Sequence, residues 1–295
     1  MTPHNFGGEW TREKLERVRK YLCAYTRIFT VNPRARFYRT IYVDAFAGTG
    51  RVDIRSQSDS PGVFAPADTD AVAFLQGSAQ IALEVEPPFD SYLFVEKSSK
   101  HVGALQELRD QFPARRSAIE IIPNDANITL QRWCEKTDWR SHRAVVFLDP
   151  YGMQVDWNTI KAIAATRAID LWFLFPLGVA VMRLLTNSGP PPKPWADALS
   201  RIFGDESWRD AFYPAVKEAT LFGTENIERR DVAWEKLKTY FIGRLRSVFA
   251  GVADNPLQLC KQSNSPIYLL CFAAGNSRGA RIAVRIAQDI LAPKG

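Results

Sequence analysis

Residues 40–50 read Thr-Ile-Tyr-Val-Asp-Ala-Phe-Ala-Gly-Thr-Gly, a short apolar run followed by a glycine-rich turn. The β-branched and aromatic residues of 40–43 are typical of a buried strand, and Asp44 ends it. Gly48 and Gly50 let the backbone approach a ligand where a Cβ atom would clash. Ligands of α/β proteins bind beyond the carboxyl ends of parallel strands, so this stretch predicts a nucleotide-type site. The alternative is an ordinary glycine-containing loop.

The turn lacks the full Gly-x-Gly-x-x-Gly pattern and the lysine of a phosphate-binding P-loop. An acidic residue followed by Phe-Ala-Gly-Thr-Gly instead resembles motif I of S-adenosylmethionine-dependent methyltransferases, especially those acting on nucleobase amino groups. The resemblance implies that Asp44 and the turn bind the methionine part of the donor. The turn residues concerned are Phe46, Ala47, Gly48, Thr49 and Gly50.

A second predicted strand, Ser91–Val95, ends at Glu96-Lys97. In dinucleotide and methyl-donor sites, an acidic residue that closes the second strand accepts hydrogen bonds from ribose hydroxyls. Glu96 lies further from the glycines than in shorter sites of this kind, because residues 51–85 intervene. We therefore expect Glu96, with Lys97 beside it, to contact the donor; a surface glutamate at a strand end is the alternative.

A third predicted strand, 118–122, ends at Pro-Asn-Asp-Ala-Asn, residues 123–127. A polar cluster at this place either reaches the adenine amine of the donor or caps the following helix. Asp125 and Ala126 are candidate donor contacts, and helix capping by Asp125 or Asn127 is an equal alternative.

The fourth predicted strand, Arg143–Leu148, delivers Asp149-Pro150-Tyr151-Gly152. Pro150 fixes its own φ angle and restricts Asp149 to extended geometry. An amine nucleophile needs an acceptor for its hydrogen and a lone pair aimed at the methyl group, and orientation contributes much of the rate of such a transfer. Tyr151 offers an aromatic face to a planar base. A turn Asp-Pro with a packing tyrosine is the alternative.

The rest of the chain alternates helices with strands. Helices are predicted at 9–29, 71–85, 98–111, 128–136, 156–167, 231–250 and 277–291, with a short one at 176–183 and helical segments around 195–216. Further strands are predicted at Ile169–Phe175, Leu257–Gln262 and Pro266–Phe272, the last two forming a hairpin. The alternation implies a mostly parallel sheet with helices on both faces, and the hairpin adds an antiparallel strand.

Composition narrows the class of protein. With 295 residues and 46% hydrophobic content, the chain can bury one large core and a small insertion. No apolar run approaches the roughly 20 residues of a membrane span, and the amino terminus lacks a secretory signal, so we expect a soluble cytoplasmic protein. The cysteines are widely spaced, which predicts free thiols, and the histidines lack metal-ligand spacing, so no protein-bound metal is expected. These residues are Cys23, Cys134, Cys260, Cys271, His4, His101 and His142.

The net charge of +6 is concentrated at one end. Residues 1–40 hold nine lysines and arginines and three glutamates, which gives +6 and leaves the remainder neutral on balance. A basic end is expected of a protein that binds a polyanion such as tRNA or DNA. A solvated helix face is the alternative.

The predicted elements resemble the class I methyltransferase fold, a doubly wound, mostly parallel seven-stranded α/β sheet of Rossmann-like type whose seventh strand is reversed. The resemblance implies three parts. Residues 1–39 form a basic helical flank, residues 40–175 and 231–295 form the Rossmann-like domain, and residues 176–230 form a helical insertion over the catalytic edge.

A closer resemblance rests on Val-Asp-Ala-Phe-Ala-Gly-Thr-Gly (43–50), Pro-Pro-Phe-Asp (87–90), Phe-Leu-Asp-Pro-Tyr-Gly-Met-Gln-Val (147–155) and Leu-Phe-Pro-Leu-Gly-Val (174–179). Gly77-Ser78 before Ile81-Ala-Leu-Glu, and Arg183-Leu-Leu, belong to the same set. Together they resemble the three-Cys-motif partner protein family, bacterial proteins linked to a radical-type partner that bears three cysteines. The resemblance spans nearly the whole chain and implies a methyltransferase-like fold and a possible partner protein.

The Asp-Pro-Tyr-Gly run also resembles the Asp-Pro-Phe-Gly of tRNA guanine-N2 methyltransferases and the Asp-Pro-Pro-Tyr of adenine-N6 and cytosine-N4 enzymes. It departs from the latter, because Tyr151 stands where a second proline would be and Gly152 where the stacking aromatic would be. The departure leaves the base and the stacking role open.

The leading hypothesis is S-adenosylmethionine-dependent methylation of a nucleic-acid base nitrogen. Asp149 and Pro150 would orient the acceptor nitrogen and Tyr151 would flank the base, which must leave the stack if the substrate is duplex DNA. Candidate substrate contacts are Arg51, Tyr151, Gly152 and Arg183. The alternatives are a non-catalytic or partner-dependent donor-binding subunit, and methyl transfer to a protein or small molecule.

Overall fold

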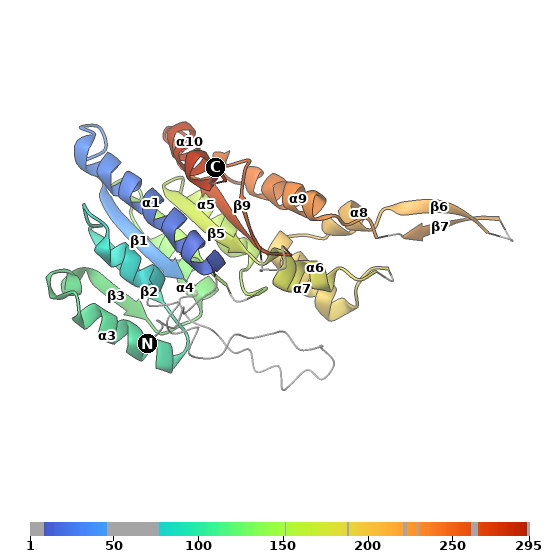
Figure 1. The fold of residues 1–295 in the computed structure, drawn as a ribbon, viewed down its shortest axis with the longest axis horizontal. Coiled ribbons are helices and arrows are strands. Elements are labelled where there is room, and N and C mark those ends of the chain that lie inside the picture. The colour runs from blue at the N-terminus through green and yellow to red at the C-terminus, as the bar shows by residue number, and fades with distance from the viewer. Residues whose placement is uncertain are drawn as a thin grey trace.

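The structure is a computed structural model and describes residues 9–45, 77–150, 152–187, 189–220, 223–228, 230–260 and 265–293. A central sheet runs in the order β3-β2-β1-β4-β5-β10-β8, with β9 paired to another part of β10 (Figure 1). The strands are β1 (Arg39–Ala45), β2 (Ser91–Val95), β3 (Ile119–Ile122), β4 (His142–Leu148), β5 (Ile169–Phe175), β8 (Gly251–Val252), β9 (Leu257–Cys260) and β10 (Pro266–Ala274).

Strands β1 to β5 run parallel to one another, whereas β10 runs antiparallel to β5. The chain moves outward from β1 to β3, then returns to the other side of β1 for β4 and β5. The carboxyl ends of β1 and β4 therefore meet where the strand order reverses, which is the place where ligands bind in sheets of this kind. The predicted α/β fold, a mostly parallel Rossmann-like sheet with a reversed strand, is confirmed, although the sheet has eight strands and not the predicted seven.

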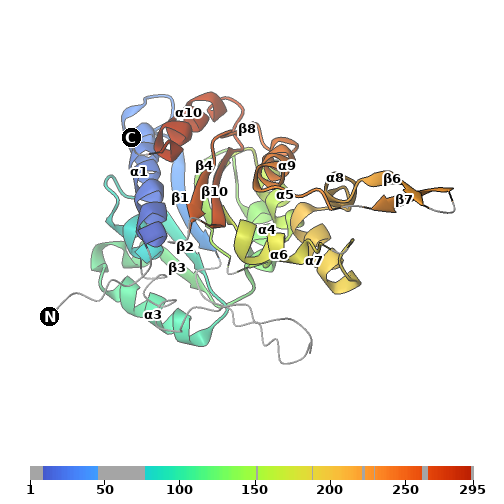
Figure 2. The same cartoon turned by 45° about the vertical axis from the view of Figure 1, so that its right-hand side comes forward.

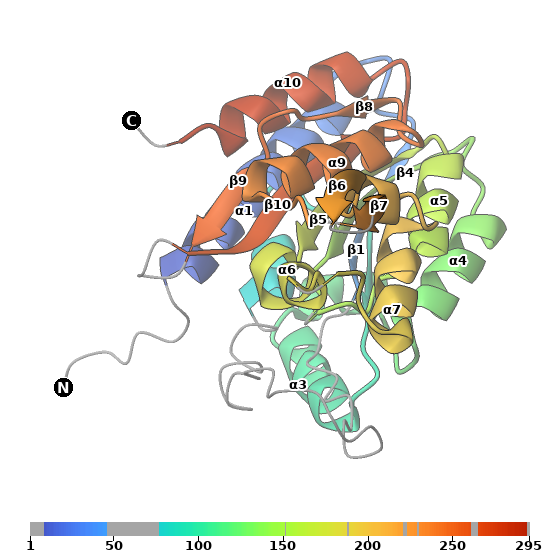
Figure 3. The same ribbon diagram turned by 90° about the vertical axis from the view of Figure 1, so that its right-hand side faces the viewer.

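Two layers of helices cover the sheet (Figure 2). One layer consists of α1 (Glu9–Val31), α3 (Ser99–Asp110) and α10 (Ala280–Leu291), together with helical residues 77–84. The other layer consists of α4 (Ala126–Lys136), α5 (Trp157–Ala165), α7 (Lys193–Phe203) and α9 (Trp234–Arg246). Figure 3 shows α1 and α10 on the side of the sheet away from α4 and α5.

Each face of the sheet has its own apolar core. Because successive side chains of a strand point to opposite faces, a strand buried on both sides is mostly apolar along its length, as β4 and β5 are. On the α1 side, aromatic side chains such as Tyr42, Phe147 and Trp172 are fully buried. On the other side, Phe175 stacks on Phe241 of α9 with ring centroids 3.8 Å apart.

The segment between β5 and α9 departs from the expectation of a helical insertion. It contains η3 (Leu177–Val181), α6 (Met182–Leu184), α7 and α8 (Trp208–Phe212), but then a two-stranded hairpin of β6 (Ala215–Thr220) and β7 (Gly223–Glu228). The hairpin extends away from the body in Figure 1. Its strands contain few apolar residues, so the periodicity that marks a strand is weak and the sequence did not reveal it.

Two smaller elements complete the chain. The 3₁₀ helix η2 (Pro113–Ala118) leads into β3, and the two-residue strand β8, which the sequence did not predict, follows α9.

Within the described residues, no helix combines the length and the apolar character needed to cross a bilayer. The four cysteines are free; Cys134 and Cys271 are buried, and Cys23 and Cys260 are half-buried.

Candidate active site at the carboxyl edge of the sheet

Asp44 and Asp149 lie at the adjacent carboxyl ends of β1 and β4. The register pairs Asp44 with Phe147 and Ala45 with Leu148, so Asp149 is the first residue beyond this pairing. Phe147 faces the α1 side, and alternation along a strand places the side chains of Asp44 and Asp149 on that same side. The structure therefore brings together the two carboxylates that the sequence singled out.

Lys14 of α1 extends onto this pair of carboxylates. Its side chain is fully buried, and its Nζ donates a hydrogen bond to Asp149 Oδ2 at 2.7 Å. The ammonium group also lies 5.7 Å from the ring centroid of Phe147 and 5.5 Å from that of Trp10. A buried ammonium group needs such partners, because its desolvation alone is strongly unfavourable.

Lys14 is not among the candidate residues predicted from the sequence, although a signal was present. Trp10, Val18, Tyr21 and Tyr25 form one stripe of α1, and position 14 falls within it. A lysine inside an apolar stripe is unusual, because lysine is almost never fully buried unless it is paired. That observation alone would have marked Lys14 as a residue with a buried acidic partner.

The buried charges shift one another's pKa values. Burial lowers the pKa of Lys14, while Asp149 and Asp44 act in the opposite direction. Burial raises the pKa of Asp149, and the neighbouring Lys14 ammonium partly offsets this rise. Burial also raises the pKa of Asp44 to about 7, against hydrogen bonds from Ser78 and Tyr42 that favour the ionised form. One cation thus serves two carboxylates, so the cluster holds a proton near neutral pH.

One oxygen of Asp44 is available for a further partner. The Tyr42 hydroxyl donates to Oδ2 at 3.3 Å, whereas Oδ1 is buried and has no hydrogen-bond partner among the described residues. A buried carboxylate oxygen without a donor is costly. A ligand with an ammonium or hydroxyl group would satisfy it.

Glu96 lies on the other side of β1, directly after β2. The register pairs Ala45 with Val95 on one side and with Leu148 on the other, so Glu96 and Asp149 belong to the two strand tips beside β1. The Glu96 side chain is buried; Oε1 accepts a hydrogen bond from the Ser98 N–H and lies 3.8 Å from His101 Nδ1, while Oε2 has no hydrogen-bond partner within the described ranges. Burial raises the pKa of Glu96, against backbone hydrogen bonds from Ser98 and Lys97.

The third strand tip contributes a helix cap. Asp125 is the N-cap residue of α4 and accepts a hydrogen bond from the Ile128 N–H at 3.1 Å through Oδ1, which is the capping alternative raised by the sequence. Asn127 is buried and bonds the segment that follows Asp149, donating to the Gln154 carbonyl and accepting from the Asp156 N–H. Asn127 therefore fixes the chain beyond β4.

The remaining candidates differ in exposure. Ala126 and Pro150 are buried and Gly152 is half-buried, whereas Lys97 is exposed. Arg183 is exposed on α6, past the carboxyl end of β5. Several candidates lie outside the described residues, namely Phe46, Ala47, Gly48, Thr49, Gly50, Arg51 and Tyr151.

The basic amino-terminal segment is less exposed than its sequence implies. Of its nine lysines and arginines, Lys14 is fully buried and Arg17 is 4% exposed. Arg17 donates to the carbonyls of Ile290 and Ala292 and pairs with Glu13, so it fastens α1 to the end of α10. The other seven side chains are exposed, namely Arg12, Arg19, Lys20, Arg27, Arg34, Arg36 and Arg39.

These residues fit the chemistry of a nucleoside donor. Three acidic side chains lie at the ends of β2, β1 and β4, and two of them carry buried oxygens that accept from no group among the described residues. Ribose hydroxyls and an ammonium group are donors that such oxygens accept. Within the described part of the chain, no group of three or more His, Cys, Asp or Glu side chains could hold a metal ion.

Comparisons with known proteins give little at the level of sequence. No known protein family and no curated protein matches the chain. A conserved hypothetical protein of Streptococcus pyogenes is 18% identical with a TM-score of 0.30, covering 52% of this chain and 76% of that one. Protein LPL1258 of Legionella pneumophila, of family DUF519, is 10% identical with a TM-score of 0.48, covering 97% and 92%. The methyltransferase domain of a citrinin polyketide synthase is 13% identical with a TM-score of 0.29, covering 81% and 46%.

Proposed function

We propose that the protein is an S-adenosylmethionine-dependent methyltransferase that modifies a nitrogen of a nucleic-acid base. One observation carries the proposal: Asp44 and Asp149 lie side by side at the point where the strand order reverses, with Glu96 on the neighbouring strand tip and a buried lysine that fixes Asp149. Ligands of Rossmann-like sheets bind at this point, and a nucleoside donor has groups that match each carboxylate.

The donor would be held across the tips of β1, β2 and β3. Asp44 and the turn that follows it would bind the methionine part, Glu96 the ribose hydroxyls, and Asp125 with Ala126 the adenine; Lys97 borders the same strand tip. When bound, the donor supplies a sulfonium-activated methyl group. Asp44 and Glu96 each keep one buried oxygen that lacks a partner among the described residues, which supports this assignment because each such oxygen needs a hydrogen-bond donor.

Asp149 would orient the acceptor. Lys14 occupies Oδ2, which directs Oδ1 to the N–H of an acceptor nitrogen and keeps the carboxylate fixed. Asp149 would accept the proton that the acceptor nitrogen gives up when its lone pair takes the methyl group. Pro150 holds the main chain, Tyr151 and Gly152 would flank the base, and Arg51 and Arg183 would contact phosphates.

The choice of a nucleic-acid base rests on the exposed basic side chains of the amino-terminal segment. Arginine and lysine contacts to phosphates supply most of the affinity of proteins that bind nucleic acids without sequence preference. A partner-dependent role is the second candidate. The projecting β6–β7 hairpin favours it, because both strands of a two-stranded sheet have an open edge that another chain can pair with.

The experiment is a transfer assay with the purified chain. Protein as purified is analysed for bound S-adenosylmethionine or its demethylated product, and labelled donor is then offered with total tRNA, DNA or lysate protein. We expect label in nucleic acid with the wild type and with Asp289→Asn, a substitution on the exposed face of α10, and none with Asp149→Asn.

The outcomes separate the candidates. Unchanged turnover of Asp149→Asn, or transfer to protein alone, would overturn the proposal. Activity that arises only after a three-cysteine partner protein is added would replace it with the partner-dependent role.

A further inference from the structure

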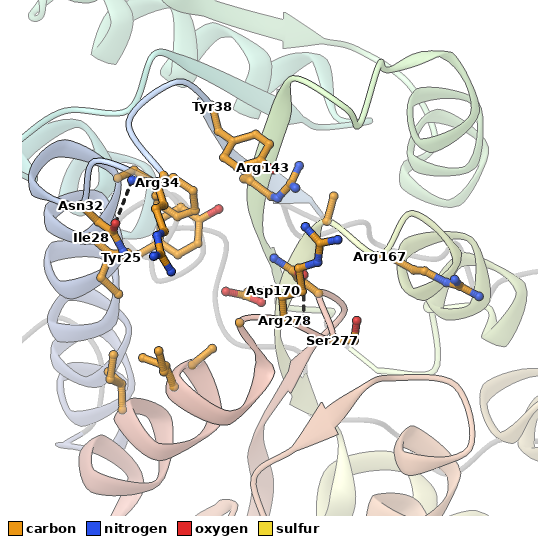
Figure 4. A pocket seen from close by; sticks show the side chains of 18 of the residues that line it. Tyr25, Ile28, Asn32, Arg34, Tyr38, Arg143, Arg167, Asp170, Ser277 and Arg278 are labelled. Atoms are coloured by element: carbon orange, nitrogen blue, oxygen red, sulfur yellow. Dashed lines mark hydrogen bonds between the residues drawn. The ribbon is translucent and has the colours of Figure 1, made fainter.

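A cavity of about 580 Å³ opens at the opposite edge of the sheet from Asp44 and Asp149 (Figure 4). It lies between the second half of α1 and the start of α10, and its inner end is formed by the first residues of β4 and β5. Arg143 is the second residue of β4 and Asp170 the second of β5, whereas Asp149 follows the end of β4. Six residues of extended strand separate Arg143 from Asp149, roughly 20 Å.

The cavity wall contains hydrogen-bond donors that no acceptor among the described residues satisfies. Tyr25 lines the cavity and is 4% exposed, yet its hydroxyl has no partner in that part of the chain. In Figure 4 the side chain of Tyr25 extends from α1 toward the inside of the cavity. The same holds within the described ranges for the buried Nε of Arg143, although its Nη1 donates to the carbonyls of Trp139 and His142. Both groups can donate to the oxygens of a ligand.

The positions of the charged groups favour an anion. Arg34 and Arg278 are exposed and approach the cavity from its two sides, and Arg143 stacks on Tyr38 with its guanidinium carbon 3.6 Å from the ring centroid. Arg167 also borders the cavity, but its side chain points away from it in Figure 4. The opposing charge is Asp170, whose Oδ2 accepts a hydrogen bond from the Tyr21 hydroxyl at 2.7 Å.

Burial raises the pKa of Asp170 to about 7, against the hydrogen bond from Tyr21 and the charge of Arg143. The lining therefore presents three arginine side chains, Arg34, Arg143 and Arg278, against one carboxyl group of raised pKa, which favours a bound anion.

The apolar side chains that line the rest of the cavity suit a ligand with a flat apolar surface. Tyr25, Ile28 and Phe29 of α1 face Ile282 and Ile286 of α10 across the cavity, and Ile282 is 62% exposed although it is a large apolar side chain. Small-molecule sites combine mostly apolar walls with a few placed polar groups, in volumes of about 300–1,000 Å³. The cavity has this make-up.

We propose that this cavity binds a nucleoside monophosphate, either free or as part of an RNA strand. The base would lie between the apolar side chains of α1 and α10, the phosphate would contact Arg34 and Arg278 at the rim, and the sugar or phosphate oxygens would accept from Tyr25 and Arg143. This inference is independent of the proposed methyl transfer, because it uses none of the residues at the carboxyl edge.

The test is calorimetric titration of the full-length protein with AMP, GMP and UMP. Two variants probe the cavity: Arg278→Ala removes a rim charge, and Tyr25→Phe removes only a hydroxyl group. Arg281→Ala is the matched control, since Arg281 is an exposed arginine three positions along the chain that does not line the cavity. We expect at least about tenfold weaker nucleotide binding for Arg278→Ala and about threefold for Tyr25→Phe, with Arg281→Ala unchanged.

Two further ligands decide whether both halves of the nucleotide are recognised. Adenosine and ribose 5-phosphate should each bind at least about tenfold more weakly than AMP. Equal binding of ribose 5-phosphate and AMP, or equal weakening in Arg278→Ala and Arg281→Ala, would overturn the proposal, as would the absence of binding by all three nucleotides. Displacement of AMP by a short RNA would assign the site to an RNA strand, and its failure would assign it to free nucleotides.

The same variants distinguish this site from the carboxyl edge. Arg278→Ala and Tyr25→Phe should bind S-adenosylmethionine with wild-type affinity if the carboxyl edge is the donor site. Weakened donor binding in these variants would show that the donor occupies this cavity instead, and would overturn the second site.

Discussion

Lys14 is a residue of α1 whose side chain reaches the carboxyl edge of the sheet and pairs with Asp149. Its ammonium group is fully buried and pairs with Asp149, while the pKa values of both groups are shifted by burial against their mutual attraction. Buried ion pairs of this kind add little net stability compared with apolar residues, because desolvation offsets the attraction. We therefore infer that the role of Lys14 is to hold the Asp149 carboxylate in one orientation.

The stability of single and double variants tests this role. Asp149→Ala leaves Lys14 buried without this carboxylate and should lower the free energy of unfolding by about 3–5 kcal/mol. Adding Lys14→Met removes the buried charge and should recover most of that decrease, whereas methyl transfer should be absent in both variants. Urea denaturation measures the first effect and the transfer assay the second. A decrease no larger than that of Asp289→Ala would contradict the account.

The elements that position the site were largely predictable from the sequence. β2 and β5 have the predicted bounds, and β1, β3 and β4 differ from prediction by one or two residues, because long apolar strands and amphipathic helices have strong periodicity. The adjacency of Asp44 and Asp149 follows from the strand order of the structure, in which β1 and β4 are neighbours although β2 and β3 lie between them in the chain. The pairing of Lys14 and the cavity between α1 and α10 were not predicted, since each depends on how α1 packs against distant strands.

Weakly patterned elements were the ones missed. β6 and β7 are held by backbone pairing from Ala215–Glu228 to Thr220–Gly223, and β8 is two residues long, so neither gives a readable apolar pattern. The expected helical character of 176–230 was therefore correct for α7 and α8 and wrong for 215–228.

Two glycines differ sharply in what a side chain would meet. Gly204 ends α7 in the left-handed region at φ 95°, and a Cβ atom there would lie 2.0 Å from Trp157 Cδ1 of α5. Gly204→Ala should lower the free energy of unfolding by about 2 kcal/mol or more, because it adds left-handed strain and a clash with a buried ring. Gly103 lies within α3, where a Cβ atom would meet nothing within 4 Å, so Gly103→Ala should stabilise by up to about 1 kcal/mol. Equal effects in thermal denaturation would contradict this packing.

At the scale of the whole molecule, the sheet carries a carboxyl group of raised pKa near each edge. Asp44 is buried and Asp170 is half-buried, and desolvation raises the pKa of each to about 7 from an ordinary 3.8. The folded protein therefore binds more protons than the unfolded chain between about pH 4 and 7, so its stability falls with rising pH across this window and levels off above it. Above about pH 7, the raised pKa of each carboxyl group lowers the free energy of unfolding by at most roughly 4 kcal/mol.

Removing one of the two carboxylates tests this pH dependence. Asp170→Asn should keep an acceptor for Tyr21 but abolish the titration, so its stability should fall less than that of the wild type between about pH 5 and 8. Chemical denaturation at a series of pH values measures the difference. Parallel curves for the two proteins would contradict the raised pKa of Asp170.

The exposed basic side of α1 should govern nucleic-acid binding. Arg19→Glu with Arg27→Glu should weaken tRNA binding and reduce the slope of log affinity against log salt, by about 0.7–0.9 for each phosphate that the variant no longer neutralises. The control is Arg132→Glu with Arg246→Glu, which makes the same charge change at exposed positions of α4 and α9 on the opposite face. Fluorescence anisotropy in increasing salt measures both, and identical slopes for the two double variants would contradict a role for α1.

Donor binding at the carboxyl edge is tested most directly by calorimetric titration of S-adenosylmethionine into the wild type, Glu96→Gln and Glu120→Gln. Glu96 is buried at the tip of β2, whereas Glu120 is exposed on the neighbouring β3 and serves as the control. We predict one donor per chain for the wild type, the same affinity for Glu120→Gln, and at least about tenfold weaker binding for Glu96→Gln, because the ribose would no longer meet a charged acceptor. No binding by the wild type, or equal affinity in all three proteins, would contradict the assignment of this edge as the donor site.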